Sequence, residues 1–271
     1  MDDRDLRERT IRDFGEQWSH YPDNDAYYAS LDLLRDFCEP LLPLRDLKGS
    51  RVADIGSGTG RIVRMLIEAG ASHVTAVEPS DSVEILRKNT ADISSRVAII
   101  HGPGEAVAAE KNLDFVISIG VLHHIPDPVP VLKAAYRALK PGGRLMIWVY
   151  GREGNRLYLA IFGSLRAITV RLPHSWLQAF CWSLNFAASA YGAACRVVPL
   201  PMHGYMRGVF LKLTPKRREQ MIYDQLNPAY AKYYSREDVI ELLTSAGFEE
   251  ILLHHRHGYS WAAVARKPPQ P

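Results

Sequence analysis

The sequence predicts an α/β fold in which helices cover both faces of a mainly parallel sheet. The chain has 271 residues, of which 47% are hydrophobic, enough for one core and an added subdomain. Val52–Ile55 reads as a short buried strand, followed by three closely spaced glycines and then by apolar residues at helical spacing. His73–Val77 reads as a second strand, and this strand–helix–strand order favours parallel pairing.

The glycines Gly56, Gly58 and Gly60 predict a tight turn between the first strand and a helix that begins near Thr59. The helical spacing stops at Gly70, a residue suited to a helix C-terminus. Glycine here lets the backbone pass close to a ligand, because no Cβ stands in the way. The turn therefore predicts a ligand site at the carboxyl end of the first strand.

Two acidic residues suggest which ligand the turn binds. Asp54 stands just before the glycines, where its charge would repel a pyrophosphate but attract the ammonium of an amino-acid-bearing cofactor such as S-adenosylmethionine. Glu78 ends the second strand, where a carboxylate can accept both hydroxyls of a ribose. The chain has no Gly-x-x-x-x-Gly-Lys-Ser/Thr loop, which argues against a nucleoside triphosphate site.

Five segments in this order resemble the class I S-adenosylmethionine-dependent methyltransferases of the small-molecule type. They are Asp54–Gly60, Glu78, Leu113–Asp127, Leu139–Val149 and Tyr234–Phe248. The resemblance implies a Rossmann-like, doubly wound, seven-stranded, mainly parallel sheet with a helical insert between the fifth strand and the closing strands. It also implies S-adenosylmethionine as methyl donor and S-adenosylhomocysteine as product.

The cofactor-binding residues implied by the resemblance come from four turns of the sheet. They are Asp54, Gly56, Ser57, Gly58, Gly60, Glu78, Pro79, Gly104, Glu105 and Ser118. The adenine contact departs from the family pattern, because Pro103 occupies the position of the usual acid. Either Glu105 or the backbone around Gly104 is left to make that contact.

The predicted domain organisation has three parts. Residues 1–48 form a helical cover over the active site, residues 49–152 and 214–267 form the cofactor-binding core, and residues 153–213 form a helical cap or dimerisation insert. In the cover, Asp2–Asp13 and Asp25–Leu42 have helical character and flank an aromatic loop, Phe14–Pro22. Trp18 and Tyr21 from this loop, with Tyr150 after the fifth strand, are expected on the substrate side; the alternative is that the aromatics only pack helices onto the sheet.

The insert is basic and aromatic. Residues 154–218 contain nine Lys or Arg and no Asp or Glu, whereas the whole chain has a net charge of only +3. Helices are expected over about Arg156–Leu172, Ser175–Val197 and Tyr205–Leu213. The stretch Leu172–Cys195 is too polar for a transmembrane segment. The role of the insert remains open: it could form an apolar cap helix, a dimer contact, a cationic cavity for an apolar or anionic acceptor, or a peripheral membrane contact.

Two histidines are the candidate catalytic residues. His123 and His124 follow the fourth strand, in the loop that faces the transferred methyl group in the family, and a neutral histidine could take the acceptor's proton. The alternative is a structural role. The run His254–His257 looks metal-binding, but successive side chains of a strand face opposite ways, so no metal site and an edge strand are predicted.

The predicted function is methyl transfer to a small, apolar or anionic acceptor, most readily at oxygen. The alternatives are methylation of RNA or protein and a non-catalytic regulator that binds the cofactor; no nucleic-acid module is recognised. The three cysteines are widely spaced and odd in number, and the N-terminus is highly charged, so a cytoplasmic protein with reduced thiols and no secretory signal is expected.

Overall fold

The computed structural model describes residues 2–155, 159, 169, 172, 174–227 and 230–269. Within them the chain forms one seven-stranded sheet in the order β3-β2-β1-β4-β5-β7-β6. The strands are β1 Arg51–Ile55, β2 His73–Glu78, β3 Val97–His101, β4 Leu113–Ile119, β5 Leu139–Tyr150, β6 Glu249–Arg256 and β7 Ser260–Arg266. Strands β1 to β5 are parallel and β7 is antiparallel to both neighbours, which confirms the predicted mainly parallel α/β fold.

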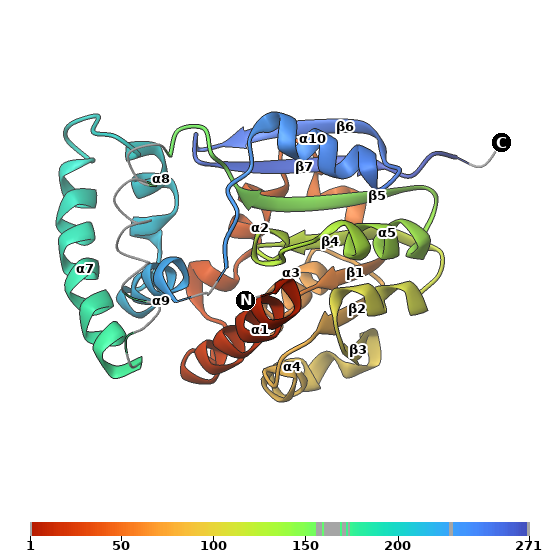
Figure 1. Ribbon diagram of the computed structural model, residues 1–271, viewed down its shortest axis with the longest axis horizontal. Helices are drawn as coiled ribbons and strands as arrows, with labels where there is room; N and C mark the ends of the chain where they lie inside the picture. Colours follow the sequence, from red (N-terminus) through yellow and green to blue (C-terminus); the bar gives the residue numbers. More distant parts are fainter. Residues whose placement is uncertain are drawn as a thin grey trace.

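Helices lie on both faces of the sheet and beyond one end of it (Figure 1). The α-helices are α1 Asp3–His20, α2 Leu31–Cys38, α3 Arg61–Glu68, α4 Val83–Asn89, α5 Val129–Ala138, α7 His174–Ala194, α8 His203–Gly208, α9 Pro215–Leu226 and α10 Arg236–Ser245. Short 3-10 helices are η1 Ala26–Ala29, η2 Leu44–Leu47, η3 Ala91–Arg96, η4 Gly104–Ala109, η5 Leu122–His124 and η6 Phe210–Lys212. No helix of these residues is long and apolar enough to cross a membrane.

The core consists of two layers separated by the sheet. Successive side chains of a strand point to opposite faces, so Val52 joins the layer that contains Leu34 of α2, and Ala53 joins the layer that contains Leu132 of α5. Because both faces are covered, the central strands read as continuous apolar runs. The sheet is therefore a rigid base for the loops at its carboxyl edge.

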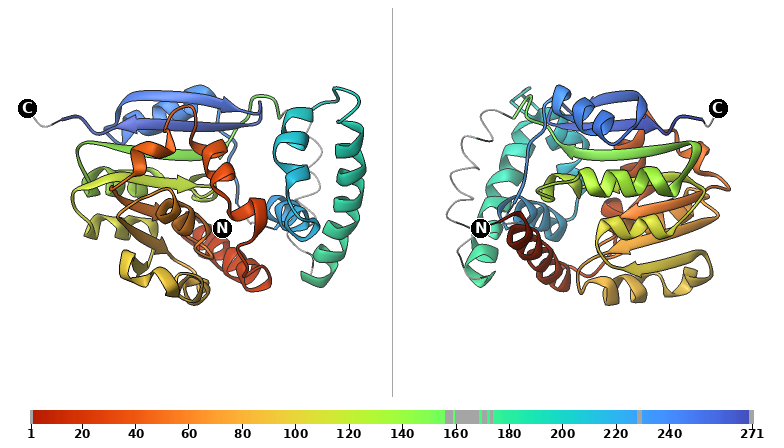
Figure 2. Two further views of the ribbon diagram at one scale, coloured as in Figure 1. Left: turned by 180° about the vertical axis from the view of Figure 1, so that it is seen from behind. Right: turned by 45° about the vertical axis from the view of Figure 1, so that its right-hand side comes forward.

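Helices α7, α8 and α9 form a separate layer beyond the carboxyl ends of the parallel strands, visible in Figure 1 and from behind in Figure 2. Leu177 and Cys181 of α7 pack against Tyr223 and Leu226 of α9. The helix expected over Ser175–Val197 is present as α7, and the one expected near Tyr205–Leu213 is present as α8 and η6. The helix expected over 156–172 lies mostly outside the described residues. The division of the chain at residue 213 stays a prediction.

The first helix is longer than the sequence indicates. Residues 14–20, expected in a loop, continue α1 to His20. Asp2 caps the helix by accepting a hydrogen bond from the Asp5 N–H (2.8 Å). The low helix propensity of Gly15 is outweighed because its Cα packs close to Ser80, where an added Cβ would lie 3.3 Å from the Ser80 Cβ. Trp18 therefore reaches the site from a helix and not from a loop.

Candidate active site

The glycine turn between β1 and α3 requires glycine at the positions that the sequence indicates. Gly56, Gly58 and Gly60 have φ angles of +78°, +52° and +86°, a region that other residues rarely adopt. A Cβ on Gly56 would lie 2.4 Å from a methyl group of Val121. The loop is thus a backbone cradle that any side chain at Gly56 would fill.

Asp54 lies beneath this cradle, behind the residues that line the cavity, and is almost fully buried, with 1% of its surface exposed. Its Oδ2 has no hydrogen-bond partner among the described residues. Burial raises the pKa of the Asp54 carboxyl to about 7, although a hydrogen bond from Ser57 and the charge of Arg61 oppose this. A buried carboxylate with an open acceptor would gain from a cationic ligand group, and the ammonium of S-adenosylmethionine fits this requirement.

Glu78 connects the second strand to the glycine loop. Its Oε2 accepts a hydrogen bond from the Gly58 N–H (2.7 Å), and its Oε1 accepts hydrogen bonds from the Ser80 N–H (3.0 Å) and hydroxyl (2.5 Å). These bonds hold the carboxylate at the cavity wall. A carboxylate has about four acceptor positions, so one remains for a ribose hydroxyl without breaking any of the three bonds.

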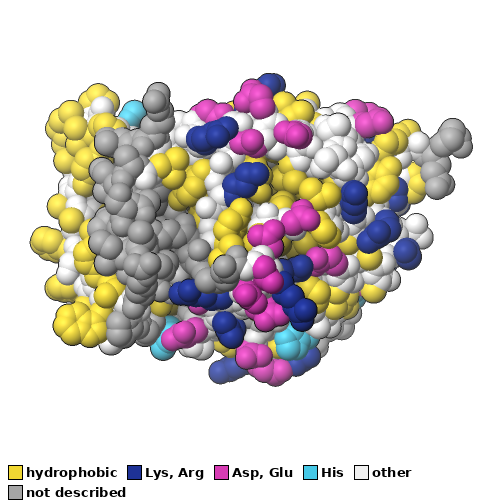
Figure 3. Space-filling model, viewed as in Figure 1, with side chains coloured by type: hydrophobic (Ala, Val, Ile, Leu, Met, Phe, Trp, Pro, Cys, Tyr) yellow, Lys and Arg dark blue, Asp and Glu magenta, His cyan; other side chains and the backbone are white. Residues whose placement is uncertain are grey.

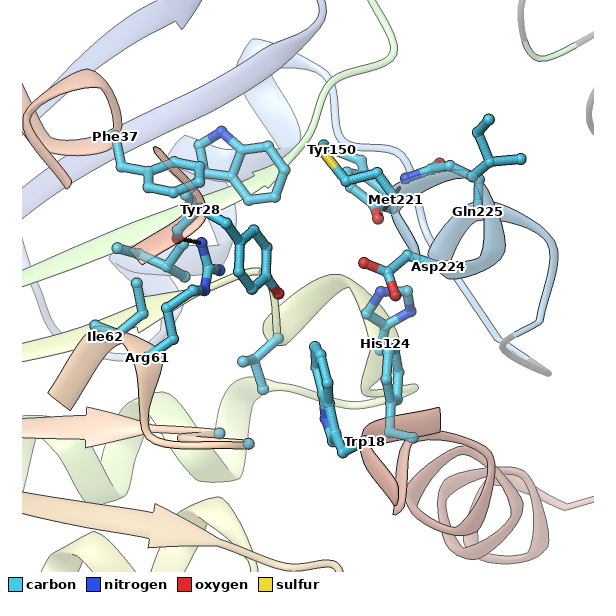
Figure 4. A pocket seen from close by; sticks show the side chains of 18 of the residues that line it. Trp18, Tyr28, Phe37, Arg61, Ile62, His124, Tyr150, Met221, Asp224 and Gln225 are labelled. Carbon is cyan, nitrogen blue, oxygen red and sulfur yellow. Dashed lines mark hydrogen bonds between the residues drawn. The ribbon is translucent and has the colours of Figure 1, made fainter. Parts of the chain in front are cut away.

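A cavity of about 660 Å³ extends from the glycine loop to the helical layer. Its wall includes the glycine loop, the ends of β1, β2 and β4, and side chains from α1, α7, α8 and α9. Figure 4 shows Trp18, Tyr28 and Tyr150 around this space, with Arg61 on one side and Asp224 on the other. The volume falls within the range of small-molecule sites, and its lining is mostly apolar.

The other predicted cofactor residues form two groups: some line the cavity, and the others lie outside its lining. Ser57, Pro79 and Gly104 line the cavity. Gly60 and Ser118 are outside its lining; the Ser118 hydroxyl donates to the Ile55 carbonyl (3.5 Å) and so links β4 to β1. Glu105 is also outside the lining.

Arg7 of α1 holds Glu105 through two hydrogen bonds (2.9 and 2.5 Å). The guanidinium also holds the pKa of the Glu105 carboxyl below its usual value, against the opposing effect of burial. Beside Glu105, the cavity is instead lined by Pro103 and Gly104, the segment from which the adenine contact is expected. A Cβ on Gly104 would lie 2.9 Å from Val131, so this close approach also depends on glycine.

The two histidines occupy different places. His123 is fully buried outside the cavity lining, with its ring 3.8 Å from the ring of Tyr150 and 5.9 Å from that of Trp148. His124 lines the cavity, and its Nδ1 lies 2.8 Å from the Tyr230 carbonyl oxygen. A carbonyl can only accept, so Nδ1 carries a proton and Nε2 is the basic nitrogen of the neutral ring. Of the pair, only His124 is placed to contact a ligand.

The three predicted substrate-side residues also differ. Trp18 lines the cavity and lies against Gly58, where an added Cβ would be 3.3 Å from the indole nitrogen. Tyr150 lines the cavity and its hydroxyl accepts a hydrogen bond from Gln225 (2.7 Å). Tyr21 is buried outside the lining, with its hydroxyl hydrogen-bonded to Glu219 (3.2 Å). Tyr21 therefore supports the packing of α1 against α9.

The sequence reasoning missed the contribution of α9. Asp224 lines the cavity, accepts a hydrogen bond from the buried Gln17, and has a pKa raised to about 7 by burial. Arg217 is 1% exposed and donates to Asp25 (2.7 Å) and Gln220 (2.6 Å). A signal for this helix was present, because Thr214 followed by proline at the first helical position is a typical helix start.

His254 and His255 lie in β6, which is an edge strand of the sheet as predicted, and His257 follows the strand. The His255 ring stacks on Trp261 (4.4 Å between centroids), and His257 contacts Asp36 (2.8 Å). No group of three or more His, Cys, Asp or Glu in the described part of the chain could hold a metal ion.

Comparison with known proteins agrees with this architecture. Residues 53–147 match the family model of a methyltransferase domain. Ubiquinone biosynthesis O-methyltransferase of Xanthomonas oryzae pv. oryzae is 34% identical over 122 residues, which cover 44% of this chain and 51% of that protein. The protein of the same name from Roseobacter denitrificans is 28% identical over 138 residues, covering 51% and 56%. The chain thus spans about half the length of the curated relatives it matches.

Solved structures resemble the chain over a greater length but at low identity. An S-adenosylmethionine-dependent methyltransferase of Thermotoga maritima, described as a possible histamine N-methyltransferase, is 21% identical with a TM-score of 0.51, covering 95% of this chain and 99% of that one. Human N-acetylserotonin methyltransferase in complex with S-adenosylmethionine is 16% identical with a TM-score of 0.51, covering 97% and 56%. At these identities the likeness concerns the fold. The match to the methyltransferase-domain model covers residues 53–147, from β1 into β5, and the solved structures share the fold of this α/β core.

Proposed function

We propose that this protein transfers a methyl group from S-adenosylmethionine to an oxygen atom of a small, largely apolar acceptor. The observation that carries the proposal is the single cavity of about 660 Å³, which joins the glycine loop to an aromatic chamber under α7, α8 and α9. A methyltransferase needs such continuity, because donor and acceptor must meet in line within one enclosed space. The name of the curated relatives, ubiquinone biosynthesis O-methyltransferase, supports oxygen as the receiving atom.

The cofactor end of the cavity would hold the methyl donor by charge and by backbone contact. Asp54 would pair with its ammonium, Glu78 would accept a hydrogen bond from a ribose hydroxyl, and the backbone of Gly104 would contact the adenine. When bound, the cofactor supplies an electrophilic methyl group on a sulfonium, which is a good leaving group. The protein's remaining task is to orient the acceptor and remove its proton.

The acceptor end would hold an apolar ring or chain between Trp18, Tyr28 and Tyr150. His124 would take the acceptor's hydroxyl proton on Nε2 while its Nδ1 donates to the Tyr230 carbonyl. A bond then forms between the acceptor oxygen and the methyl carbon, and the bond from that carbon to sulfur breaks. The products are the methyl ether, S-adenosylhomocysteine and a proton on His124.

The test combines calorimetric binding of S-adenosylmethionine and S-adenosylhomocysteine with an assay of S-adenosylhomocysteine formation on a panel of phenols, aromatic acids and acyl acids. We expect both cofactors to bind and at least one phenol to be methylated. In His124→Gln, kcat should fall by about 10²–10⁴ while the affinity for the cofactor is retained. Cofactor binding with no methylation of any panel member would instead support a non-catalytic regulator.

A further inference from the structure

The outer face of α7 exposes large apolar side chains to solvent. Trp176, Trp182 and Phe186 are 71%, 65% and 76% exposed, and Val197, just after the helix, is 86% exposed. In a helix with 3.6 residues per turn, the three aromatic side chains fall within an arc of about 120°. No Lys, Arg, Asp or Glu occurs in residues 174–194. Clusters of this kind on a folded surface usually mark a binding site.

The opposite face of α7 already has its partner. Leu177 and Cys181 are buried against α9, so the exposed aromatic face is not required for packing within the chain. Figure 1 shows α7 as the outermost element at that end of the molecule, and Figure 3 shows hydrophobic side chains gathered along the same edge. The face is thus open to a large, flat partner.

Charge indicates which partner fits. Residues 154–218 contain nine Lys or Arg and no acidic residue. Arg196, Arg207 and Lys212 are exposed and form no ion pair within the described residues. Arg196 follows the end of α7 by two residues, and an anionic lipid surface would attract these cations.

The cavity reaches the surface at the same helix. Ala187 and Tyr191 are exposed residues of α7, and both also line the cavity. A lipid-soluble acceptor could therefore move between a bilayer and the chamber without crossing open water. This last point rests on the proposed function, whereas the surface itself does not.

We propose that α7 is a membrane-docking helix that lies in the interface of an anionic phospholipid bilayer, with Trp176, Trp182 and Phe186 inserted among the lipid headgroups. Tryptophan side chains favour this interfacial region, and an amphipathic helix binds there through buried apolar area and attraction of nearby cations. Because Ala187 and Tyr191 of the same helix line the cavity, docking of α7 would bring the cavity close to the lipid.

The experiment is co-sedimentation of the full chain with vesicles of phosphatidylcholine alone and of phosphatidylcholine with phosphatidylglycerol in equal parts. We expect binding to the anionic vesicles that weakens as salt is raised. The double variant Trp182→Ser/Phe186→Ser should bind about a hundredfold more weakly, since each side chain contributes roughly tenfold on moving from water into the interface. Brominated lipid should quench the fluorescence of the wild-type chain.

Leu252→Ser is the matched control, because Leu252 is also an exposed apolar side chain (56%) but lies on the edge strand β6. It should leave vesicle binding unchanged. Wild-type binding that is absent, or equal in the double variant, would overturn the proposal. So would a dimer, seen by sedimentation without lipid, that the double variant abolishes. Calorimetric cofactor binding, measured in parallel without lipid, separates this outcome from failure of the proposed methyl transfer.

Discussion

Replacing Asp54 by asparagine should remove a pH dependence from cofactor binding. In the cofactor-free protein, burial raises the pKa of Asp54 to about 7, so the carboxyl is largely protonated in mildly acidic solution. Only the ionised form attracts an ammonium. Binding of S-adenosylmethionine should therefore strengthen as the pH rises toward 7 and should release a proton.

The magnitude follows from the ionised fraction. With a pKa near 7, about 3% of Asp54 is ionised at about pH 5.5 and about half at about pH 7, so the affinity should rise roughly fifteenfold between them. The same shift affects folding. Because the folded-state pKa is raised above 3.8, stability is lost as the pH rises from about 4 to about 7, by about 4 kcal/mol. Asp54→Asn should therefore stabilise the cofactor-free fold above pH 7 while it weakens cofactor binding.

The assay is titration calorimetry at several pH values, in buffers of different ionisation enthalpy so that proton release is counted directly. Asp224→Asn is the matched control, because the pKa of Asp224 is similarly raised but this residue belongs to α9, in the helical layer. It should keep the pH dependence of cofactor binding, and Asp54→Asn should lose it. Equal pH profiles for wild type and Asp54→Asn would refute the assignment of Asp54 to the ammonium.

Three further outcomes are expected. Gly56→Ala should lower the free energy of unfolding, measured with urea, by about 1–3 kcal/mol and should reduce cofactor affinity. The double variant Gly56→Ala/Val121→Ala should recover only the part of this lost stability that is due to the 2.4 Å contact with Val121. Arg217→Met should cost about 3 kcal/mol in the same measurement, because it leaves buried acceptors unpaired, whereas Asp25→Ala, at a half-exposed site, should cost less than about 1 kcal/mol. Burial raises the pKa of the Cys38 thiol to about 12, so it should react with a disulfide reagent at pH 8 only after unfolding; rapid reaction of the native protein would contradict its burial.

The sheet and the cofactor cradle could be predicted because they depend on local patterns. The apolar run Val52–Ile55 matches β1 to within one residue, and the glycines after it have the positive φ angles that their spacing suggests. Glu78 stands at the end of β2, as predicted. Such features are encoded within a few residues, so one sequence is enough to find them.

The acceptor side could not be predicted because it depends on contacts between distant segments. Gln17 and Asp224 form a hydrogen bond across 207 residues of chain, and Arg217 reaches Asp25 across 192. These two pairs hold α9 over the cavity, but none of their four residues belongs to a local motif. The same applies to the end of α1, where packing of Gly15 on Ser80 continues a helix that its glycine would otherwise interrupt.

The position of β7 between β5 and β6 has a consequence for folding during translation. A nascent chain that ends before Ser260 leaves the edge of β5 open and gives β6 no strand to pair with, although β1 to β5 can already form their parallel ladder. Such an intermediate exposes unpaired strand edges, which is the condition that favours misassembly. The ribosome must therefore release residues 260–266 before the sheet can close.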